Sequence, residues 1–236
     1  MNISSSKYKM IAHKGIYDNK TVPENSIKSF ELALKKNIPI ELDIHILKDN
    51  TIVVFHDNNL LRMTGINRKI KDLTYKELIK YSLINSSYTI PTLDEILKLI
   101  NGKVLLDIEI KNDNRTKDMC RLLSNKLDNY QGKFIIKSFY PNIIHWFKIN
   151  RPNYIRGILI PTIQKNKYIN LLNIKKIPLN YTDPNFLAIN KNIIKKKFVI
   201  KQRKKGMKIM VWTIKDKKEL EDLKNYADYF VIDIKP

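Results

Sequence analysis

The chain has 236 residues, and 43% of them are hydrophobic, which excludes a disordered or fibrous protein and suits one large α/β barrel or two small domains. Lysine and arginine number 44 against 23 aspartates and glutamates, so the formal net charge is +21. This charge attracts anions such as nucleic acid, phosphorylated substrates or an acidic membrane surface. The lysines are spread along the whole chain, however, and Asn and Ile are plentiful, which favours compositional drift as the simpler explanation. The densest basic run, Lys195–Lys205, contains Phe198, Val199 and Ile200 and predicts one amphipathic helix.

The only cysteine, Cys120, leaves no intramolecular disulfide to form, which fits a reducing compartment. It falls in a helical stretch, Asp118–Leu127, with no matched histidine nearby, so we expect no nucleophilic role for it. The first residues, Met1–Met10, are polar and lack the apolar centre of a signal peptide, and no run approaches the length of a membrane span. We therefore expect a soluble, cytoplasmic protein, with peripheral membrane contact and the oligomeric state left open.

Short β-rich runs alternate with helical stretches along the chain, which is typical of the α/β class. Helices are expected at Asn25–Lys36, Thr92–Ile100 and Asp216–Asn225. Asn25 or Ser26 would cap the first of these, and Thr92 with Glu95 forms a capping box in the second. Eight strands with intervening helices predict one TIM (β/α)8 barrel domain over residues 1–236, with a doubly wound open sheet as the structural alternative. The expected strands are Tyr8–Ala12, Pro39–Ile44, Val104–Ile110, Lys133–Lys137, Ile155–Ile160, Phe186–Ile189, Lys208–Trp212 and Tyr229–Ile232.

A long segment interrupts this alternation after the second strand. A second extended run, Thr51–His56, follows the turn at residues 48–50, and the segment 57–103 then passes before the next strand begins. Loops in a barrel are usually far shorter. We therefore expect an insertion at about residues 57–103 that lies over the mouth of the barrel and contains some helix of its own.

Carboxylates occupy one face of the second strand. Glu41, Asp43 and His45 alternate with aliphatic residues, so the polar set would point into the barrel near the C-terminal end of the strand, and the aliphatic set toward the helices. Two buried carboxylates are costly unless a cation neutralises them, and oxygen ligands suit Mg²⁺ or Ca²⁺. The competing interpretation is an exposed edge strand with solvated carboxylates.

The third strand repeats this arrangement. Asp107, Glu109 and Lys111 share one face, and aliphatic residues occupy the other. Neighbouring barrel strands would bring Glu109 beside the two carboxylates of the earlier strand, which makes a site for a hard cation with open positions for a ligand. Lys111 would stay close enough to hold an anionic group.

Two of the four histidines fall at strand ends, where a barrel enzyme places its active site. His13 follows an apolar run and precedes Lys14-Gly15, and His56 ends the run that precedes Asp57. A histidine pair can act as base and acid near neutral pH. His45 would support the metal ligands from behind, and His145 lies in a predicted helix and is expected to be structural.

The tripeptide Pro23-Glu24-Asn25 precedes the first helix. Glu24 and Asn25 are placed to reach back to the rim of the first strand, or they form a plain helix start with proline near the N-terminus and asparagine as the cap.

The order of these pieces resembles the glycerophosphodiester phosphodiesterase family over almost the whole chain. Any one piece is weak, but the ordered set is highly specific. The matching segments are Ile11-Ala12-His13-Lys14-Gly15, Pro23-Glu24-Asn25-Ser26, Ile40-Glu41-Leu42-Asp43-Ile44-His45, Val53-Val54-Phe55-His56-Asp57, Leu61-Arg62-Met63-Thr64-Gly65, Ile90-Pro91-Thr92-Leu93-Asp94-Glu95, Asp107-Ile108-Glu109-Ile110-Lys111, Ser138-Phe139, Val211-Trp212-Thr213-Ile214 and Ile232-Asp233.

This resemblance implies a TIM barrel with a small insertion, and metal-dependent hydrolysis of glycerophosphodiesters to glycerol 3-phosphate and an alcohol. It further implies that the attacking oxygen is the neighbouring glycerol hydroxyl, giving a cyclic phosphate that water then opens. The roles that it implies are acid and base for His13 and His56, ligation of Mg²⁺ or Ca²⁺ for Glu41, Asp43 and Glu109, phosphate contact for Lys14 and Lys111, and further substrate contacts for Glu24, Asn25 and Trp212.

The chain departs from the family pattern at three places. Lys14 stands where the family usually has arginine, which holds a phosphate through two parallel bonds, whereas lysine offers a point charge. Leu47 stands where threonine is common, and the final residues 231–236 lack the usual threonine before Asp233 and space the proline differently. None of these departures removes an implied metal ligand or catalytic histidine.

Two other functions compete with this interpretation. Lysophospholipase D-like proteins and phospholipase D toxin-like proteins share the two-histidine, acidic pattern but act on acylated substrates, and an apolar groove within the insertion would favour them. A non-catalytic protein that binds anions or nucleic acid would exploit the +21 charge, although the sequence holds no nucleic-acid motif and no aromatic residues interleaved with basic ones.

Overall fold

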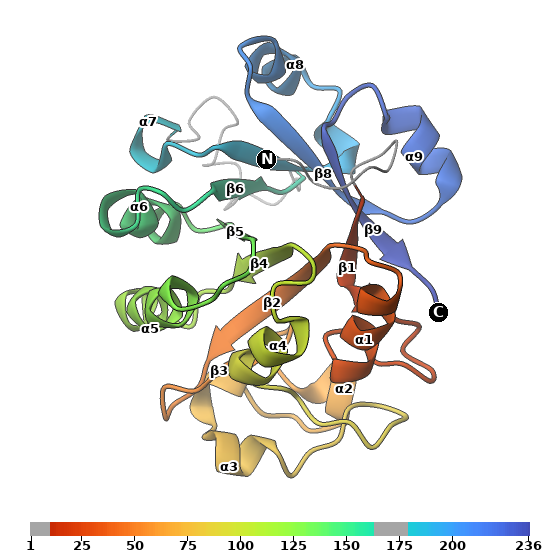
Figure 1. Ribbon diagram of the computed structural model, residues 1–236, viewed down its shortest axis with the longest axis vertical. Coiled ribbons are helices and arrows are strands. Elements are labelled where there is room, and N and C mark those ends of the chain that lie inside the picture. Colours follow the sequence, from red (N-terminus) through yellow and green to blue (C-terminus); the bar gives the residue numbers. More distant parts are fainter. Residues whose placement is uncertain (1–9, 163–178) are drawn as a thin grey trace.

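Eight parallel strands close into a barrel in the computed structural model, which describes residues 10–162 and 179–236 (Figure 1). Their order is β1-β9-β8-β7-β6-β5-β4-β2, and a pairing of β1 with β2 closes the ring. The predicted TIM barrel is therefore confirmed, and the open-sheet alternative is wrong. The barrel strands are β1 (Met10–Ile16), β2 (Ile40–Ile46), β4 (Leu106–Ile110), β5 (Phe134–Ser138), β6 (Arg156–Ile160), β7 (Phe186–Asn190), β8 (Lys208–Ile214) and β9 (Tyr229–Ile234).

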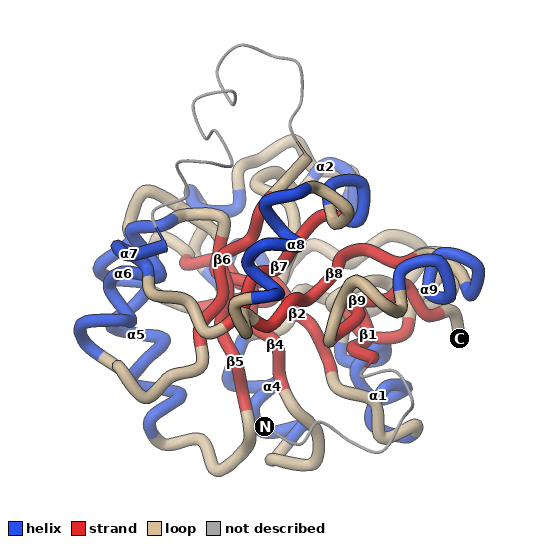
Figure 2. The backbone as a smooth tube through the Cα atoms, turned by 90° about the horizontal axis from the view of Figure 1, so that it is seen from above, coloured by secondary structure: helices blue, strands red, loops and turns tan. Residues whose placement is uncertain are grey.

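Helices connect successive strands and surround the barrel, as the view in Figure 2 shows. The outward side chains of the strands are aliphatic and form two buried clusters with helix residues such as Phe30 and Ile96 in one and Val199 and Leu220 in the other. Burial of this apolar surface drives the helices against the barrel. The helices are α1 (Ile27–Lys35), α4 (Leu93–Ile100), α5 (Thr116–Asp128), α6 (Pro141–Asn150), α7 (Leu179–Thr182), α8 (Lys197–Lys204) and α9 (Lys217–Leu223), with a 3-10 turn, η3 (Lys191–Ile193), before α8.

Helix caps follow the side chains that the sequence offers. Ser26 caps α1, because its hydroxyl accepts a hydrogen bond from the Ser29 N–H. The predicted capping box of Thr92 and Glu95 is present at the start of α4. Asn25, the other candidate cap for α1, has a left-handed backbone with φ 54° and directs its side chain into the barrel instead.

The first strand runs four residues beyond its predicted end at Ala12, and residues 8 and 9 of that prediction lie outside the described chain. Lys14 and Gly15 have positive φ, and the pairing with β9 shifts register between Ala12 and Ile16 before it resumes. A Cβ on Gly15 would lie 2.6–2.8 Å from atoms of Ser29, so only glycine fits there. This bulge turns the backbone N–H of Lys14 toward the barrel interior, where it donates to Glu41.

The insertion begins with β3 (Ile52–Val54), which pairs antiparallel with β2, and continues through α2 (Leu61–Thr64), η1 (Ile70–Asp72) and α3 (Tyr75–Leu78). Figure 1 shows it beside β2 and α1. It has its own buried apolar cluster, which includes Leu60, Met63, Leu73, Leu78 and Leu83, whereas Leu61, Ile79 and Ile84 are exposed. The prediction of an elaboration with some helix is confirmed.

Inside the barrel, apolar and polar side chains separate into layers. Toward the N-terminal ends of the strands, Ile11, Leu105, Ile135, Phe186 and Met210 belong to one buried apolar cluster. Toward the C-terminal ends, the inward residues of β2, β4 and β5 are charged. Because the apolar layer closes one end, polar groups of the interior can meet a ligand only at the C-terminal end, where barrel enzymes hold their active sites.

Two further sequence predictions have clear outcomes. The basic run forms α8, in which Val199 is buried and Ile200 is exposed beside the lysines. Cys120 is buried in α5, and burial raises the pKa of its thiol to about 12, which agrees with the absence of a nucleophilic role.

None of the helices in residues 10–162 and 179–236 is both long and apolar enough to cross a membrane.

Candidate active site

Three carboxylates meet inside the barrel near the C-terminal ends of β2 and β4. The parallel register sets Glu41 beside Asp107 and Asp43 beside Glu109 on the inward face. One oxygen atom from each of Glu41, Asp43 and Glu109 lies within 4.8 Å of the other two, and all three residues are buried. The structure thus brings together the three residues that the sequence proposed as metal ligands, and the edge-strand alternative is wrong.

Two buried lysines neutralise part of this acidic cluster. Lys111 Nζ forms ion pairs with Glu109 and, at 2.8 Å, with Asp43 Oδ1. Lys137 Nζ lies 3.2 Å from Glu41 Oε1 and 2.6 Å from Asp107 Oδ2. Burial lowers the pKa of each lysine, but the adjacent carboxylates outweigh it and hold both values above the usual range. Both ammonium groups therefore remain charged at neutral pH.

Lys137 was not among the predicted site residues. It stands in the apolar strand β5, and only the alternation of inward residues, Ile135 then Lys137, signals that it faces the interior. Its partner Asp107 lies beside Glu41 in the parallel register, and burial raises the pKa of Asp107 to about 7 despite the opposing effect of Lys137. Lys137 thus compensates buried charge next to the three carboxylates.

We predict that Lys137→Met destabilises the fold by about 3–5 kcal/mol, because removal of one partner leaves buried carboxylates without compensation. Lys133→Met, an exposed lysine just before β5, is the matched control and should change stability by less than about 0.5 kcal/mol. The double substitution Asp107→Leu/Lys137→Met should recover part of the loss. Urea unfolding measures all three, and equal midpoints for both single variants would contradict the prediction.

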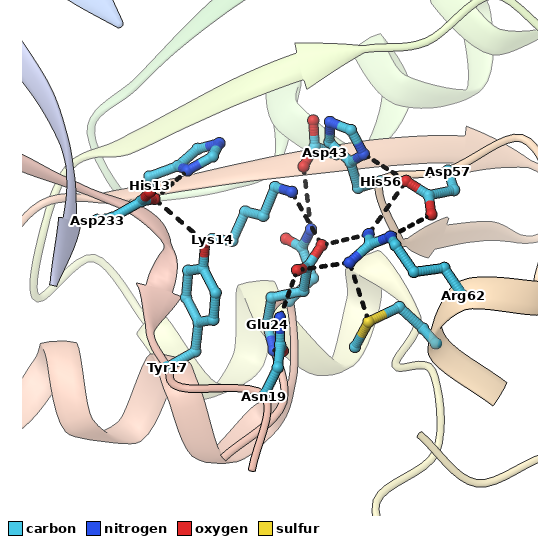
Figure 3. Close-up of polar contacts among 12 residues, drawn as sticks. His13, Lys14, Tyr17, Asn19, Glu24, Asp43, His56, Asp57, Arg62 and Asp233 are labelled. Carbon is cyan, nitrogen blue, oxygen red and sulfur yellow. Dashed lines mark hydrogen bonds and ion pairs between the residues drawn. The ribbon is translucent and has the colours of Figure 1, made fainter. Parts of the chain in front are cut away.

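His13 lies in β1 with its ring at the rim of the acidic cluster. Its Nδ1 is 2.6 Å from Asp233 Oδ1, and its Nε2 is 4.0 Å from Glu41 Oε2. Tyr17 also donates to Asp233, at 3.1 Å. Burial raises the pKa of Asp233, but the hydrogen bonds from His13 and Tyr17, together with the nearby His13 and Lys14, hold it below its usual range. Asp233 therefore orients the His13 ring through an ionised carboxylate (Figure 3).

His56 has an equivalent arrangement on the insertion side. Its Nδ1 is 2.6 Å from Asp57 Oδ1, and Arg62 Nε donates to Asp57 Oδ2 at 2.6 Å. Burial opposes ionisation of Asp57, yet the hydrogen bonds from His56 and Arg62 hold its pKa well below the usual range. Each histidine thus has a carboxylate on Nδ1, which leaves Nε2 as the atom able to exchange a proton with a ligand.

Glu24 ties the first loop to the insertion, as Figure 3 shows. It accepts from Lys14 Nζ at 2.8 Å, from Arg62 Nη2 at 2.7 Å and from Asn19 Nδ2 at 2.8 Å. Burial raises the pKa of Glu24, but these donors outweigh it and bring the value down to about 2. Sequence analysis included Arg62 in the family pattern but gave it no role; here it positions both Glu24 and Asp57.

Asn25 and Lys14 lie against the carboxylates from the β1 side. Asn25 Nδ2 donates to Asp43 Oδ2 at 3.0 Å, and the Lys14 N–H donates to Glu41 Oε2 at 3.1 Å. Asn25 Oδ1 is buried and has no hydrogen-bond partner among the described residues. Of the two interpretations of the Glu24-Asn25 pair, the one that reaches back to the rim is therefore correct.

The remaining candidate residues are His45, Trp212 and His145. His45 is buried, with Nδ1 2.8 Å from Asp113 Oδ1 and Nε2 3.4 Å from the His56 carbonyl oxygen, so it supports the His56 backbone. Trp212 packs edge-to-face on Phe139 at the upper edge of the apolar interior cluster. Its Nε1 is buried without a hydrogen-bond partner in the described part of the chain. His145 lies on α6, outside the barrel, and is structural, as predicted.

The donor set fits a hard divalent cation. Three buried carboxylates supply oxygen ligands, and Asn25 Oδ1 is an unused buried oxygen beside Asp43. Burial raises the pKa of Asp43, but Lys111 together with the nearby His56 and Lys14 holds the value well below the usual range, so this carboxylate is ionised. The carboxylates that face the cluster outnumber the ammonium groups that touch it, which leaves negative charge for a cation to neutralise.

The fold and this site define a parallel (β/α)8 barrel with an oxygen-rich cation site and two carboxylate-backed histidines at the C-terminal ends of its strands. The chain belongs to the glycerophosphoryl diester phosphodiesterase family, whose model matches residues 13–233. The match includes every residue that the sequence proposed for the site, which confirms the resemblance seen there.

Individual relatives agree with this assignment. The chain is 30% identical to YhdW of Bacillus subtilis, over 95% of this chain and 97% of that protein, whose naming as a glycerophosphodiester phosphodiesterase is itself provisional. It is 29% identical to a glycerophosphodiester phosphodiesterase of Caldanaerobacter subterraneus subsp. tengcongensis, over 90% of this chain and 88% of the relative. A phosphodiesterase of Oleispira antarctica, solved with its product sn-glycerol-3-phosphate, has the same fold with a TM-score of 0.82 and 23% identity, over 94% and 92% of the two chains.

Proposed function

We propose that this enzyme hydrolyses glycerophosphodiesters to glycerol 3-phosphate and an alcohol, with the help of a divalent cation. The observation that carries the proposal is the cluster of Glu41, Asp43 and Glu109 flanked by two carboxylate-backed histidines, in a chain of this family. The product found in the Oleispira antarctica relative supports glycerol 3-phosphate as the product here.

Glu41, Asp43 and Glu109 are the residues that would hold the cation, which is Mg²⁺ or Ca²⁺ because all three donors are carboxylates. A bound cation would supply Lewis-acid neutralisation of charge on the phosphate. Lys111 lies on the same carboxylates and Lys14 beside them, so a phosphate at this centre meets two ammonium groups. Glu24 and Asn25 orient these groups, and Trp212 offers its unpaired indole N–H to the substrate.

His13 and His56 carry the proton transfers in this proposal. One Nε2 accepts the proton of the attacking hydroxyl as its oxygen bonds to phosphorus, and the other donates a proton to the alcohol oxygen as its bond to phosphorus breaks. Asp233 and Asp57 hold the two rings so that Nε2 is available in each. If the attacking hydroxyl belongs to glycerol, the same pair exchanges roles when water opens the cyclic product.

The direct test measures glycerol phosphate released from glycerophosphocholine and glycerophosphoethanolamine by the purified protein. Release should stop with EDTA and return when Mg²⁺ or Ca²⁺ is restored. Comparison of the two cations assigns the metal. Release that persists unchanged after exhaustive chelation would refute the cation requirement, and no release with either metal would refute the activity.

Acylated substrates are the alternative within the same chemistry. The insertion buries most of its large apolar side chains in its own cluster, so few remain to line an acyl groove; Leu61, Ile79 and Ile84 are exposed. This favours deacylated substrates. Faster turnover of lysophosphatidylcholine than of glycerophosphocholine would reverse the assignment. Non-catalytic anion binding has no support from the family to which the chain belongs.

The domain organisation, the cellular location and any membrane contact of the enzyme are further proposals. We infer a single barrel domain over residues 1–236 with the insertion at about 57–103, which the family match over residues 13–233 supports. A cytoplasmic location is consistent with the free, buried thiol of Cys120. Any membrane contact would be peripheral, through the exposed lysines of α8, and binding to anionic but not zwitterionic vesicles tests it.

A further inference from the structure

A cavity of 320 Å³ lies between the insertion and the loop that follows β4. Its lining consists of four asparagines, two lysines and one aspartate, so every side chain carries an amide or a charge. Lys69 and Lys71 come from the insertion, and Asn112 and Asp113 come from the loop. A cavity of this composition suits a hydrophilic ligand rather than an acyl chain.

The residues that line the cavity are linked to the proposed catalytic residues along the chain and through hydrogen bonds. Its lining residue Asn58 follows His56 by two positions, and Asn112 directly follows Lys111. Asp113 accepts from His45 Nδ1 at 2.8 Å, and His45 Nε2 lies 3.4 Å from the His56 carbonyl oxygen. The wall of the cavity is therefore fixed to the backbone that carries His56.

This placement distinguishes the two sides of the active site. His13 and His56 approach the centre from opposite sides in Figure 3, and the cavity adjoins the residues that follow His56. A phosphodiester bound at this centre has two ester arms, and the cavity is the space next to the residues that follow His56.

The cavity carries net positive charge. Neither the Lys69 nor the Lys71 ammonium group forms an ion pair with any residue of 10–162 or 179–236. Asp113, the single carboxylate of the lining, is buried, and its two oxygens already accept from His45 and from the Ile46 N–H. Two free cations and four amides remain for a ligand, and they match an anionic group that also accepts hydrogen bonds.

We propose that this cavity binds the departing alcohol of the substrate and favours an alcohol that carries a second negative charge, such as a further phosphate, over a cationic one such as choline. The inference rests on the proposed function and adds the substrate class. Lys69 and Lys71 set specificity, since the cation and phosphate centre does not include them.

The test compares kcat/KM for glycerophosphocholine, glycerophosphoglycerol and glycerophosphoglycerol with a terminal phosphate, at low ionic strength. We expect the phosphorylated substrate to exceed the choline substrate by about tenfold or more, the size of one hydrogen bond to a charged group, with the uncharged polyol between them. In Lys69→Glu/Lys71→Glu the order should invert, with the phosphorylated substrate losing about tenfold or more and the choline substrate gaining.

The matched control is Lys201→Glu/Lys205→Glu, which makes the same charge change on exposed lysines of α8 and its C-terminal cap. It should change the preference among substrates far less than the Lys69/Lys71 variant does, because exposed lysines outside the cavity act only through screened long-range attraction. Turnover of the choline substrate reports that each variant is folded. An unchanged preference in the Lys69/Lys71 variant overturns this inference alone. No turnover of any substrate by the wild-type enzyme overturns the proposed function and the inference with it.

Discussion

His13→Ala and His56→Ala should each lower kcat on glycerophosphodiesters by about 100-fold or more, the usual contribution of a positioned acid or base. Each ring has Nδ1 held at 2.6 Å by a carboxylate, so substitution removes the only oriented Nε2 on its side of the centre. His145→Ala is the matched control, because this ring stacks on Tyr181 outside the barrel and should leave turnover unchanged. Near-normal turnover by either variant would rule out that residue's role.

Asp233→Asn extends this prediction to the residue that orients His13. The amide preserves the size of the side chain but removes the ionised acceptor that holds His13 Nδ1 at 2.6 Å. The rate should fall less than in His13→Ala, because the imidazole itself remains. Steady-state kcat of wild type and the two variants measures the difference.

Asp57→Asn is the equivalent change for His56, because Asp57 Oδ1 lies 2.6 Å from His56 Nδ1. Its rate should likewise fall less than that of His56→Ala. A wild-type rate in Asp233→Asn would show that Asp233 does not position His13.

Local patterns in the sequence were sufficient to place the three carboxylates on one inward face. In β2 and β4, polar and aliphatic residues alternate strictly, and the strand period of two places Glu41, Asp43 and Glu109 on the inward side. The barrel itself follows from eight apolar runs separated by helical stretches. Boundaries were less accurate, since β1 and β9 continue beyond their predicted ends through a bulge that contacts distant in sequence stabilise, such as those to β9 and Glu41.

The groups that support the catalytic residues were not predictable in the same way. Asp233 is 220 positions from His13, and only closure of β9 against β1 brings them together. Arg62 and Asp57 lie in the insertion, where no periodicity fixes the direction of a side chain. Lys137 was missed because its strand is otherwise apolar, although its parity with Ile135 was the available signal.

Asp43→Asn should abolish metal-dependent turnover and weaken binding of the cation by more than about 100-fold, since even groups behind a ligand contribute about 10- to 100-fold. Asp43 is the ligand at the centre of the site: it accepts from Asn25 and pairs with Lys111 while it faces Glu41 and Glu109. Calorimetric titration of Ca²⁺ and Mg²⁺ into the EDTA-treated protein measures the affinity. Asp222→Asn, an exposed aspartate of α9, is the control. Wild-type affinity in Asp43→Asn would place the cation elsewhere.

Lys111→Ala at the same ion pair should act in the opposite direction on binding. Lys111 occupies Asp43 and Glu109 in the structure, so a cation must share these carboxylates with an ammonium group. Removal of that positive charge should tighten cation binding, because like charges repel at this distance. Turnover should nevertheless fall, because the phosphate loses one of its two lysine contacts. Tighter cation binding together with slower turnover would show that Lys111 binds the phosphate and not the cation. Weaker cation binding in Lys111→Ala would contradict the prediction, because it would mean that the lysine organises the carboxylates rather than competing with the cation for them.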